Sequence, residues 1–168
     1  DDGYKKDSGY GQQKLLVKHS GQLQGWEINS SLFLSNLNQE TAGFITGFEA
    51  FRVEEEKKEN PNPEAYRDAY SLRIVSDLSK EIRGATINIQ PYLRSVGMKF
   101  LQHFLPGQPE ERNGHDSFGL SLVAQSNQWW SLGADLEFTR GFLKETQENS
   151  DRPLAFLPKR GHHLRADI

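Results

Sequence analysis

The chain has 168 residues, no Cys, a single Met and a formal net charge of -3 at pH 7 with His counted as neutral. Its Lys and Arg residues form no basic stripe, which argues against a nucleic-acid partner. No run of about 20 apolar residues occurs, which excludes a transmembrane helix but leaves room for strands that alternate apolar and polar residues.

The two ends of the chain are the least regular parts. Asp1–Gln12 is polar and rich in Gly and Tyr, unlike a signal peptide, so we expect any targeting segment to have been removed or to belong to a longer precursor. Ser8–Ser20 is predicted to form the first strand, and His162–Ile168 a last strand that is cut short. With the segments between them, we expect about seven strands.

Five central segments alternate between apolar and polar residues. They are Trp26–Leu37, Tyr70–Ser79, Gly84–Ser95, Ser117–Gln125 and Trp130–Thr139. Successive side chains of a strand point to opposite faces, so each segment has one apolar and one polar face. The polar face carries the charged residues of these segments, including Arg73, Asp77, Arg94, Asp135 and Glu137. We predict an all-β fold, an antiparallel up-and-down meander.

Alternation alone also occurs in soluble antiparallel sheets, which have one face on a core and one in water. The length of the segments favours a membrane, because a tilted membrane strand needs roughly 9–11 residues whereas ordinary strands peak near 5–6. A strand from Trp130 to Phe138 rises about 26 Å, or roughly 20 Å along a barrel axis, close to the apolar band of an outer-membrane barrel.

Aromatic residues are expected to mark two rims. All three Trp residues lie beside short connections, namely Trp26, Trp129 and Trp130. Tyr70, Tyr92 and Phe138 fall at the opposite ends of their segments. Two aromatic girdles are the usual interfacial anchors of a membrane barrel.

Short and long connections alternate along the chain. The short ones are Ser20–Gly25, Lys80–Gly84 and Ser126–Gln128, and the long ones are Asn38–Arg67, Gly97–His115 and Arg140–Gly161. Outer-membrane barrels keep short turns on the periplasmic side, so the Trp residues are expected at the periplasmic rim. Glu54–Glu59 is expected to be a solvated surface, and Pro63–Asp68 one helical turn capped by Asn62. Pro91 is expected near the outer rim, at a bulge or where pairing ends.

Several loop sequences resemble those of a known family. They are Gln39–Gly43, Asn60–Asp68, Phe100–Gly107 and Asn113–Ser117. From about Gln12 to its end, the chain resembles the barrel region of TonB-dependent outer-membrane receptors, the ligand-gated importers of iron chelates and similar nutrients. The resemblance implies a bacterial outer-membrane location, uptake driven by the TonB complex, and a barrel of roughly 22 strands with a plugged lumen.

The chain departs from that family in two respects. Nothing in it resembles the plug domain or the TonB box, and about seven strands cannot close so large a barrel. We therefore expect a segment of a longer receptor. Its expected partners are outer-membrane lipid, a small-molecule ligand, and the TonB complex through the plug region.

No catalytic constellation is present, since the chain has no Gly-x-Ser-x-Gly elbow, phosphate-binding glycine loop or His-Glu-x-x-His motif. Neither an enzyme nor a cofactor is expected. His162 and His163 are adjacent and would point to opposite faces of a strand, so no metal site is predicted. Ligand contacts are expected in the second long loop, at His103, Phe104, Arg112 and His115.

The charged residues of the polar face are expected to line the lumen of the barrel. We expect Arg73, Asp77, Arg94, Asp135 and Glu137 to pair with one another or with a plug, because buried charges need partners. Two alternatives stay open. One is a soluble all-β ligand- or carbohydrate-binding module, in which aromatic residues would line a groove. The other is a passive porin-like barrel without energy coupling.

Overall fold

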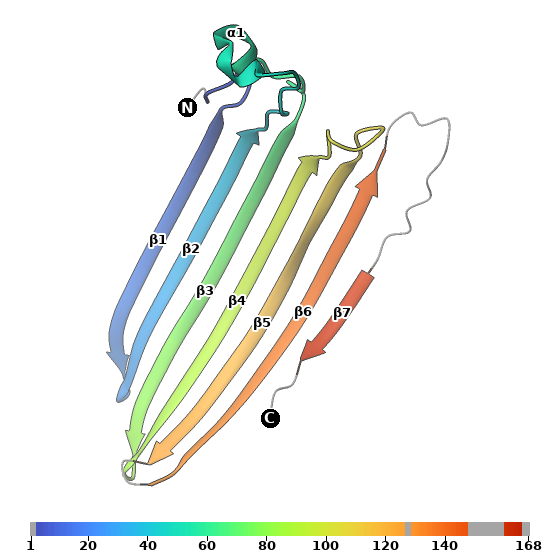
Figure 1. The fold of residues 1–168 in the computed structure, drawn as a ribbon. Coiled ribbons are helices and arrows are strands. Elements are labelled where there is room, and N and C mark those ends of the chain that lie inside the picture. Colours follow the sequence, from blue (N-terminus) through green and yellow to red (C-terminus); the bar gives the residue numbers. More distant parts are fainter. Residues whose placement is uncertain (1–2, 127–128, 148–159, 166–168) are drawn as a thin grey trace.

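A computed structural model describes residues 3–126, 129–147 and 160–165, the last of these by backbone only. Six long strands lie side by side in chain order: β1 (Tyr10–Leu23), β2 (Trp26–Glu40), β3 (Tyr66–Ile82), β4 (Ala85–Leu101), β5 (Glu110–Ser126) and β6 (Ser131–Thr146). A short strand, β7 (Arg160–Arg165), pairs with β6 (Figure 1). All neighbours are antiparallel and the sheet is open, so the predicted all-β antiparallel meander is confirmed.

The two ends of the sheet differ. Two-residue turns at Gln24–Gly25 and Arg83–Gly84 close the hairpins β1–β2 and β3–β4 at what we call the turn end. Both residues of each turn have positive φ, 51° and 79° in the first and 52° and 78° in the second. This is the type I′ geometry, whose twist matches that of the strands. Loops 41–65 and 102–109 lie at the opposite, loop end, together with the N-terminus (Figure 1).

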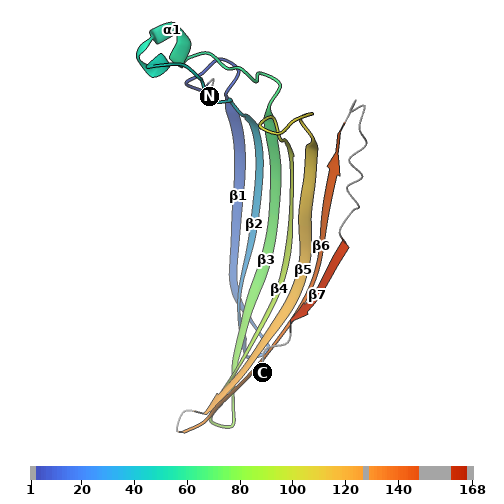
Figure 2. The ribbon, with the colours of Figure 1, turned by 45° about the vertical axis from the view of Figure 1, so that its right-hand side comes forward.

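The strands extend further than the sequence predicts. β3, β4 and β5 have 17 residues each, and they bend along their length (Figure 2). The long connections predicted at 38–67 and 97–115 shrink to 41–65 and 102–109, and the short ones at 20–25 and 80–84 shrink to two residues each. Backbone pairing continues through polar residues because it needs no apolar side chain. The connections at 126–128 and 140–161 fall partly outside the described residues.

The helical turn predicted at Pro63–Asp68 is wrong, because Tyr66 already begins β3. Helical structure instead lies just before and within the charged run, with a 3-10 turn η1 (Ala50–Arg52) followed by α1 (Glu54–Lys57). Glu54 forms ion pairs with Lys57 and with Lys58, residues three and four positions on. Such pairs stabilise a helical turn. Within the described ranges, no helix is long and apolar enough to cross a membrane.

The register gathers the apolar positions of the six long strands on one side, here called the apolar face. Its band covers nine residues in each of five strands, at Trp26–Leu34, Tyr70–Leu78, Ala85–Leu93, Phe118–Ser126 and Trp130–Phe138. β1 adds Leu15, Val17 and Leu23 to the same side. The alternation read from the sequence is therefore continuous across neighbouring strands.

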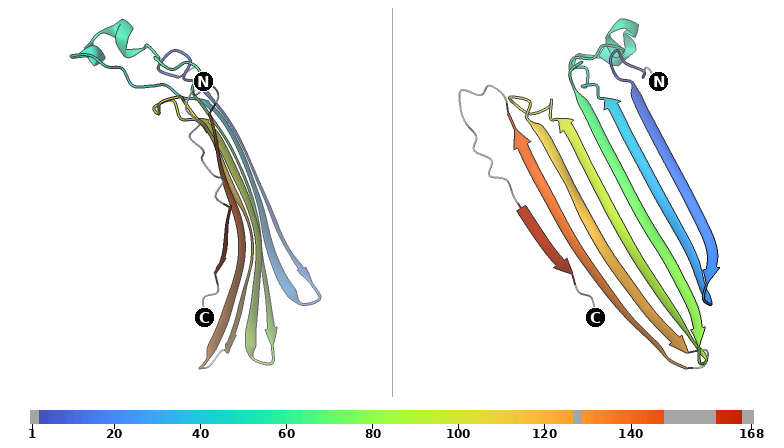
Figure 3. Two further views of the ribbon diagram at one scale, coloured as in Figure 1. Left: turned by 90° about the vertical axis from the view of Figure 1, so that its right-hand side faces the viewer. Right: turned by 180° about the vertical axis from the view of Figure 1, so that it is seen from behind.

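No second layer covers the apolar face in the part of the chain that the structure describes, and edge-on the sheet is a single layer (Figure 3). The buried hydrophobic residues there are Ala50 and Ala65, both in loop 41–65. Exposed large hydrophobic residues of the six long strands all lie on the apolar face, except Tyr10, Leu16 and Leu143. The sheet has no internal core of its own.

Two predicted positions need correction. Tyr92 lies opposite Gly119 on the other side of the sheet, the polar face, so it is not part of an aromatic rim. Pro91 lies in the middle of β4, opposite Leu120, rather than near the loop end. Pairing with β3 is interrupted there but resumes in the same register, so no bulge forms. The interruption follows from the missing N–H of proline.

Candidate functional site

Five side chains form a connected group on the polar face of β4, β5 and β6, which we call the polar cluster: Tyr92, Arg94, Ser117, Glu137 and Thr139. Glu137 accepts hydrogen bonds from the Tyr92 hydroxyl at 2.6 Å and from the Thr139 hydroxyl at 2.7 Å. The Arg94 guanidinium lies 3.5 Å from the same carboxylate and donates to the Ser117 hydroxyl at 3.3 Å. Glu137 is therefore the common acceptor of the cluster.

The register explains why these residues meet. Arg94, Ser117 and Thr139 occupy one row across the three strands, and Tyr92, Gly119 and Glu137 occupy the next row on the same face. The Tyr92 ring lies over Gly119, in the space that a Cβ there would fill. Only a glycine at that position lets the phenol reach across β5 to Glu137.

The five charged residues predicted to share a lumen do share the polar face, but only Arg94 and Glu137 pair with each other. Asp77 accepts a hydrogen bond from Gln90 instead. Asp135 is exposed on the same face. Of the pairings expected for these residues, with one another or with a plug, the structure shows one within the group, between Arg94 and Glu137.

Arg73 lies directly opposite Arg94 in the β3–β4 register and is exposed. Within the described residues, no ion pair joins Arg73 to an acidic side chain. Directly opposed like charges destabilise a sheet. Because Arg94 is already paired with Glu137, Arg73 supplies the excess positive charge at this place on the polar face, open to an anionic ligand or an acidic side chain.

The four predicted ligand contacts do not come together. His103 and Phe104 lie in loop 102–109, with their rings 5.6 Å apart at an angle of 82°. Arg112 and His115 lie within β5, on the apolar and the polar face respectively. The prediction that all four belong to one loop is wrong, because β5 begins at Glu110. His115 instead borders an open hollow beside the polar cluster, with Arg94, Glu137 and Thr139.

Loop 41–65 is held to the N-terminal segment by a residue whose role the sequence did not single out. The Asn60 side-chain carbonyl accepts from the backbone N–H groups of Gly43 and Asn62, at 3.2 and 3.0 Å. Its amide donates to the Asp7 carbonyl at 2.9 Å. The position of Asn60 before proline in a loop was the available signal, since Asn side chains often organise turns through backbone hydrogen bonds.

The two loops of the loop end contact each other. The Gln108 side chain in loop 102–109 donates to the Glu64 carboxylate in loop 41–65 at 2.8 Å. The pKa of Glu64 is lowered mainly by a hydrogen bond from its own backbone N–H, with further lowering by Gln108 and Asn62. The ionised carboxylate therefore favours the contact between the loops.

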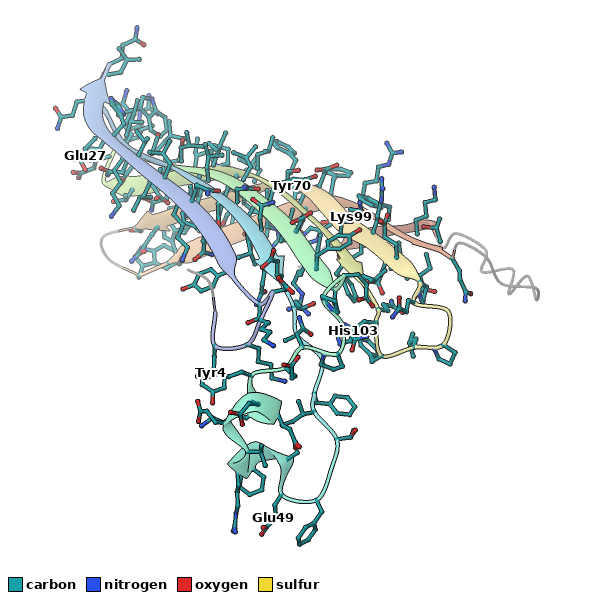
Figure 4. All side chains as sticks on the ribbon, turned by 90° about the horizontal axis from the view of Figure 1, so that it is seen from above. Tyr4, Glu27, Glu49, Tyr70, Lys99 and His103 are labelled. Carbon is teal, nitrogen blue, oxygen red and sulfur yellow. The ribbon has the colours of Figure 1, made fainter. Side chains whose placement is uncertain are left out.

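Loop 41–65 also presents apolar side chains to solvent. Phe44, Phe48 and Phe51 are strongly exposed, with Phe48 at 96%. Figure 4 shows the loop projecting beyond the sheet, with Glu49 at its far end. Aromatic side chains at a projecting loop are suited to capture a ligand or a partner.

In the described ranges, no three His, Cys, Asp or Glu side chains are grouped so that they could hold a metal ion. His162 and His163 belong to β7, and their side chains lie outside the described residues. Comparisons with protein-family models, with curated proteins and with solved structures find no match to the chain.

Proposed function

We propose that the chain forms part of the wall of a bacterial outer-membrane β-barrel, in a TonB-dependent receptor that takes up a small ligand such as an iron chelate. The observation that carries this proposal is the uncovered apolar face with its nine-residue bands. Their length fits the roughly 9–11 residues of a tilted membrane strand. A soluble module would need a second layer over this face, and the described residues supply none.

The inclination of the apolar band supports a barrel wall. In β1 and β2 the band reaches Leu15 and Leu34. The corresponding positions of β5 and β6 are Asp116 and Arg140, so the band ends one step nearer the turn end there, at Phe118 and Phe138. Barrel strands tilt by about 35–45°, so a level membrane boundary crosses successive strands at shifted register positions.

The proposed orientation follows from the two ends of the sheet. The turn end of the sheet, where Trp26 and Trp130 lie, would face the periplasm, and the larger loops would face the outside. The polar face would then line the lumen, where Arg73 and Arg94 meet an anionic ligand or an acidic group of a plug. Coupling to TonB rests on the resemblance of the loop sequences. The sheet edges β1 and β7 would pair with further strands of a longer receptor.

Topology can be tested by labelling cysteines, because the chain has none of its own. Phe48→Cys and Arg83→Cys are introduced separately into the protein that carries the chain. A membrane-impermeant maleimide added to intact bacteria should label the first and should label the second only after the outer membrane is broken. Equal labelling of both variants in a soluble fraction would overturn the membrane proposal.

Energy coupling separates the receptor from a passive porin. Uptake of ferric chelates should require both the gene that carries this chain and an intact TonB complex. Loss of TonB should abolish uptake to the same extent as deletion of the gene. Uptake that persists without TonB would favour the porin-like barrel and would leave the membrane topology intact.

A further inference from the structure

A groove of about 240 Å³ lies on the apolar face between the apolar band and the loop end. Its floor is at Gly97, which is paired with Gly114. Tyr70 and Phe142 stand on either side, opposite Gly97 and Gly114 respectively. The Tyr70 ring covers Gly97, and a Cβ at Gly114 would lie 3.0 Å from the Phe142 ring. The two glycines thus let the rings of Tyr70 and Phe142 lie close to the backbone of β4 and β5.

Three cations follow one another in the next row toward the loop end, which we call the basic row: Lys99, Arg112 and Lys144. They occupy directly opposed positions on β4, β5 and β6, on the same face. Adjacent strands are about 4.8 Å apart, so these like charges are close neighbours. Figure 4 shows Lys99 beside Tyr70 on the same side of the sheet.

One carboxylate holds part of this row in place. Glu110 lies 3.0 Å from the Lys99 ammonium and 2.7 Å from Arg112 Nε, and it accepts a hydrogen bond from the Tyr66 hydroxyl at 2.6 Å. Arg112 uses its Nε for that contact, so its terminal nitrogens remain for another acceptor. Glu110 therefore positions two of the cations. Asp68 lies directly opposite Lys99 and also lines the groove, so two carboxylates face three cations and one positive charge is in excess.

We propose that this groove binds the headgroup of an anionic lipid that carries phosphate, with the phosphate on the basic row and the acyl chains running down the apolar face. The inference rests on the proposed membrane location, but it concerns a different surface from the ligand path of the polar face. Two observations carry it: the excess positive charge of the basic row beside the groove, and an apolar surface directly below it.

The path of the acyl chains is continuous with the groove. Below Tyr70 and Gly97 the apolar face continues through Leu72, Ile74 and Leu93. Aromatic side chains prefer the level of lipid headgroups, which suits Tyr70 and Phe142. Basic residues near a membrane surface attract anionic lipids by electrostatics, and Arg chelates phosphate through paired donors.

The test uses a fluorescent label at the groove. Asn36 lines the groove outside the basic row, and Asn36→Cys provides a unique thiol for bimane in the protein reconstituted into vesicles. Quenching by spin-labelled phosphatidylglycerol is compared with quenching by spin-labelled phosphatidylcholine. We expect the anionic lipid to be preferred, by about fivefold for each engaged cation at low salt.

Two double variants in the labelled background make the test specific. Lys99→Gln with Arg112→Gln should remove most of the preference. Lys14→Gln with Lys18→Gln removes the same charge from the polar face and should leave the preference unchanged. No preference in the parent protein, or equal loss in both double variants, would overturn the lipid site. Insertion without a preference would leave the membrane proposal standing, whereas failure to insert would overturn both.

Discussion

Tyr92 and Gly119 lie directly opposite each other in the β4–β5 register, and the Tyr92 ring occupies the space of the missing Gly119 side chain. The phenol reaches Glu137 on the next strand through that space, with a hydrogen bond of 2.6 Å. An aromatic ring over a cross-strand glycine protects its backbone and fixes the register. The polar cluster therefore depends on a residue that contributes no side chain.

Gly119→Ala should destabilise the folded protein by about 1–3 kcal/mol, because the added methyl overlaps the Tyr92 ring and forces it to move. Unfolding in urea, measured after reconstitution in detergent micelles, gives the free energy. Gly133→Ala is a matched control, since its Cβ would meet ordinary contacts at 3.6 and 3.7 Å. Equal effects of the two substitutions would show that the close approach of Tyr92 has no energetic role.

The cost of an arginine substitution should depend on how deep the substituted position of the apolar face lies in the membrane. Leu122 lies at the centre of its nine-residue band, whereas Leu132 lies one step from Trp130 at the turn end. Leu122→Arg should cost about 2–4 kcal/mol as a lipid-facing midplane charge, and Leu132→Arg less. Ser121→Arg, on the polar face, is the control and should be nearly neutral. Equal costs at Leu122 and Ser121 in equilibrium unfolding from vesicles would contradict the assignment of faces.

In the five central segments the faces could be predicted from the sequence, with Tyr92 as an exception, because the period of two persists without a bulge. The charged residues Arg73, Asp77, Arg94, Asp135 and Glu137 were assigned to the polar face, and the register places them there. The strand ends could not be predicted in the same way. Arg112 and His115 belong to β5 because backbone pairing extends past the apolar band, where no hydrophobic period marks it.

Contacts between side chains on neighbouring strands could also not be predicted from the sequence. The contacts of Tyr92 with Gly119 and of Arg73 with Arg94 depend on register, which is set by turn type and length. The first residues of the two tight turns, Gln24 and Arg83, have positive φ. Asn or Asp is the usual residue at this position of such turns, so the sequence did not indicate the turn type. The polar cluster could therefore be assigned to one face but not resolved into pairs.

The contact between loops 41–65 and 102–109 should weaken in acid. The pKa of Glu64 is lowered in the folded state, so its contribution is present above the pKa of an unfolded Glu and is lost as pH falls through the folded value. Proteolysis of loop 102–109 should accordingly be faster near pH 3 than at pH 7, measured with a protease active at both values. Glu64→Gln keeps an acceptor for Gln108 without a titrating charge and should remove this pH dependence. A wild-type loop cleaved equally fast at both pH values would contradict the role of Glu64.

The isolated 168-residue chain should not be a stable monomer in plain buffer. Its apolar face exposes side chains such as Leu93, Phe118 and Leu136, and the described residues provide no layer to cover them. The edge strands β1 and β7 have no further neighbour in the described sheet, so they are templates for pairing with another chain. Burial of the apolar face in a micelle removes the hydrophobic driving force for association. Added strands that pair with β1 and β7 remove the association through unpaired edges.

Size-exclusion chromatography with light scattering, with and without detergent, measures this behaviour. We expect large or mixed species in buffer and smaller, defined species in detergent. Denaturation in urea should be cooperative only in detergent. A monodisperse monomer that unfolds cooperatively without detergent would require a hidden cover over the apolar face. That result would favour the soluble binding module over the membrane wall.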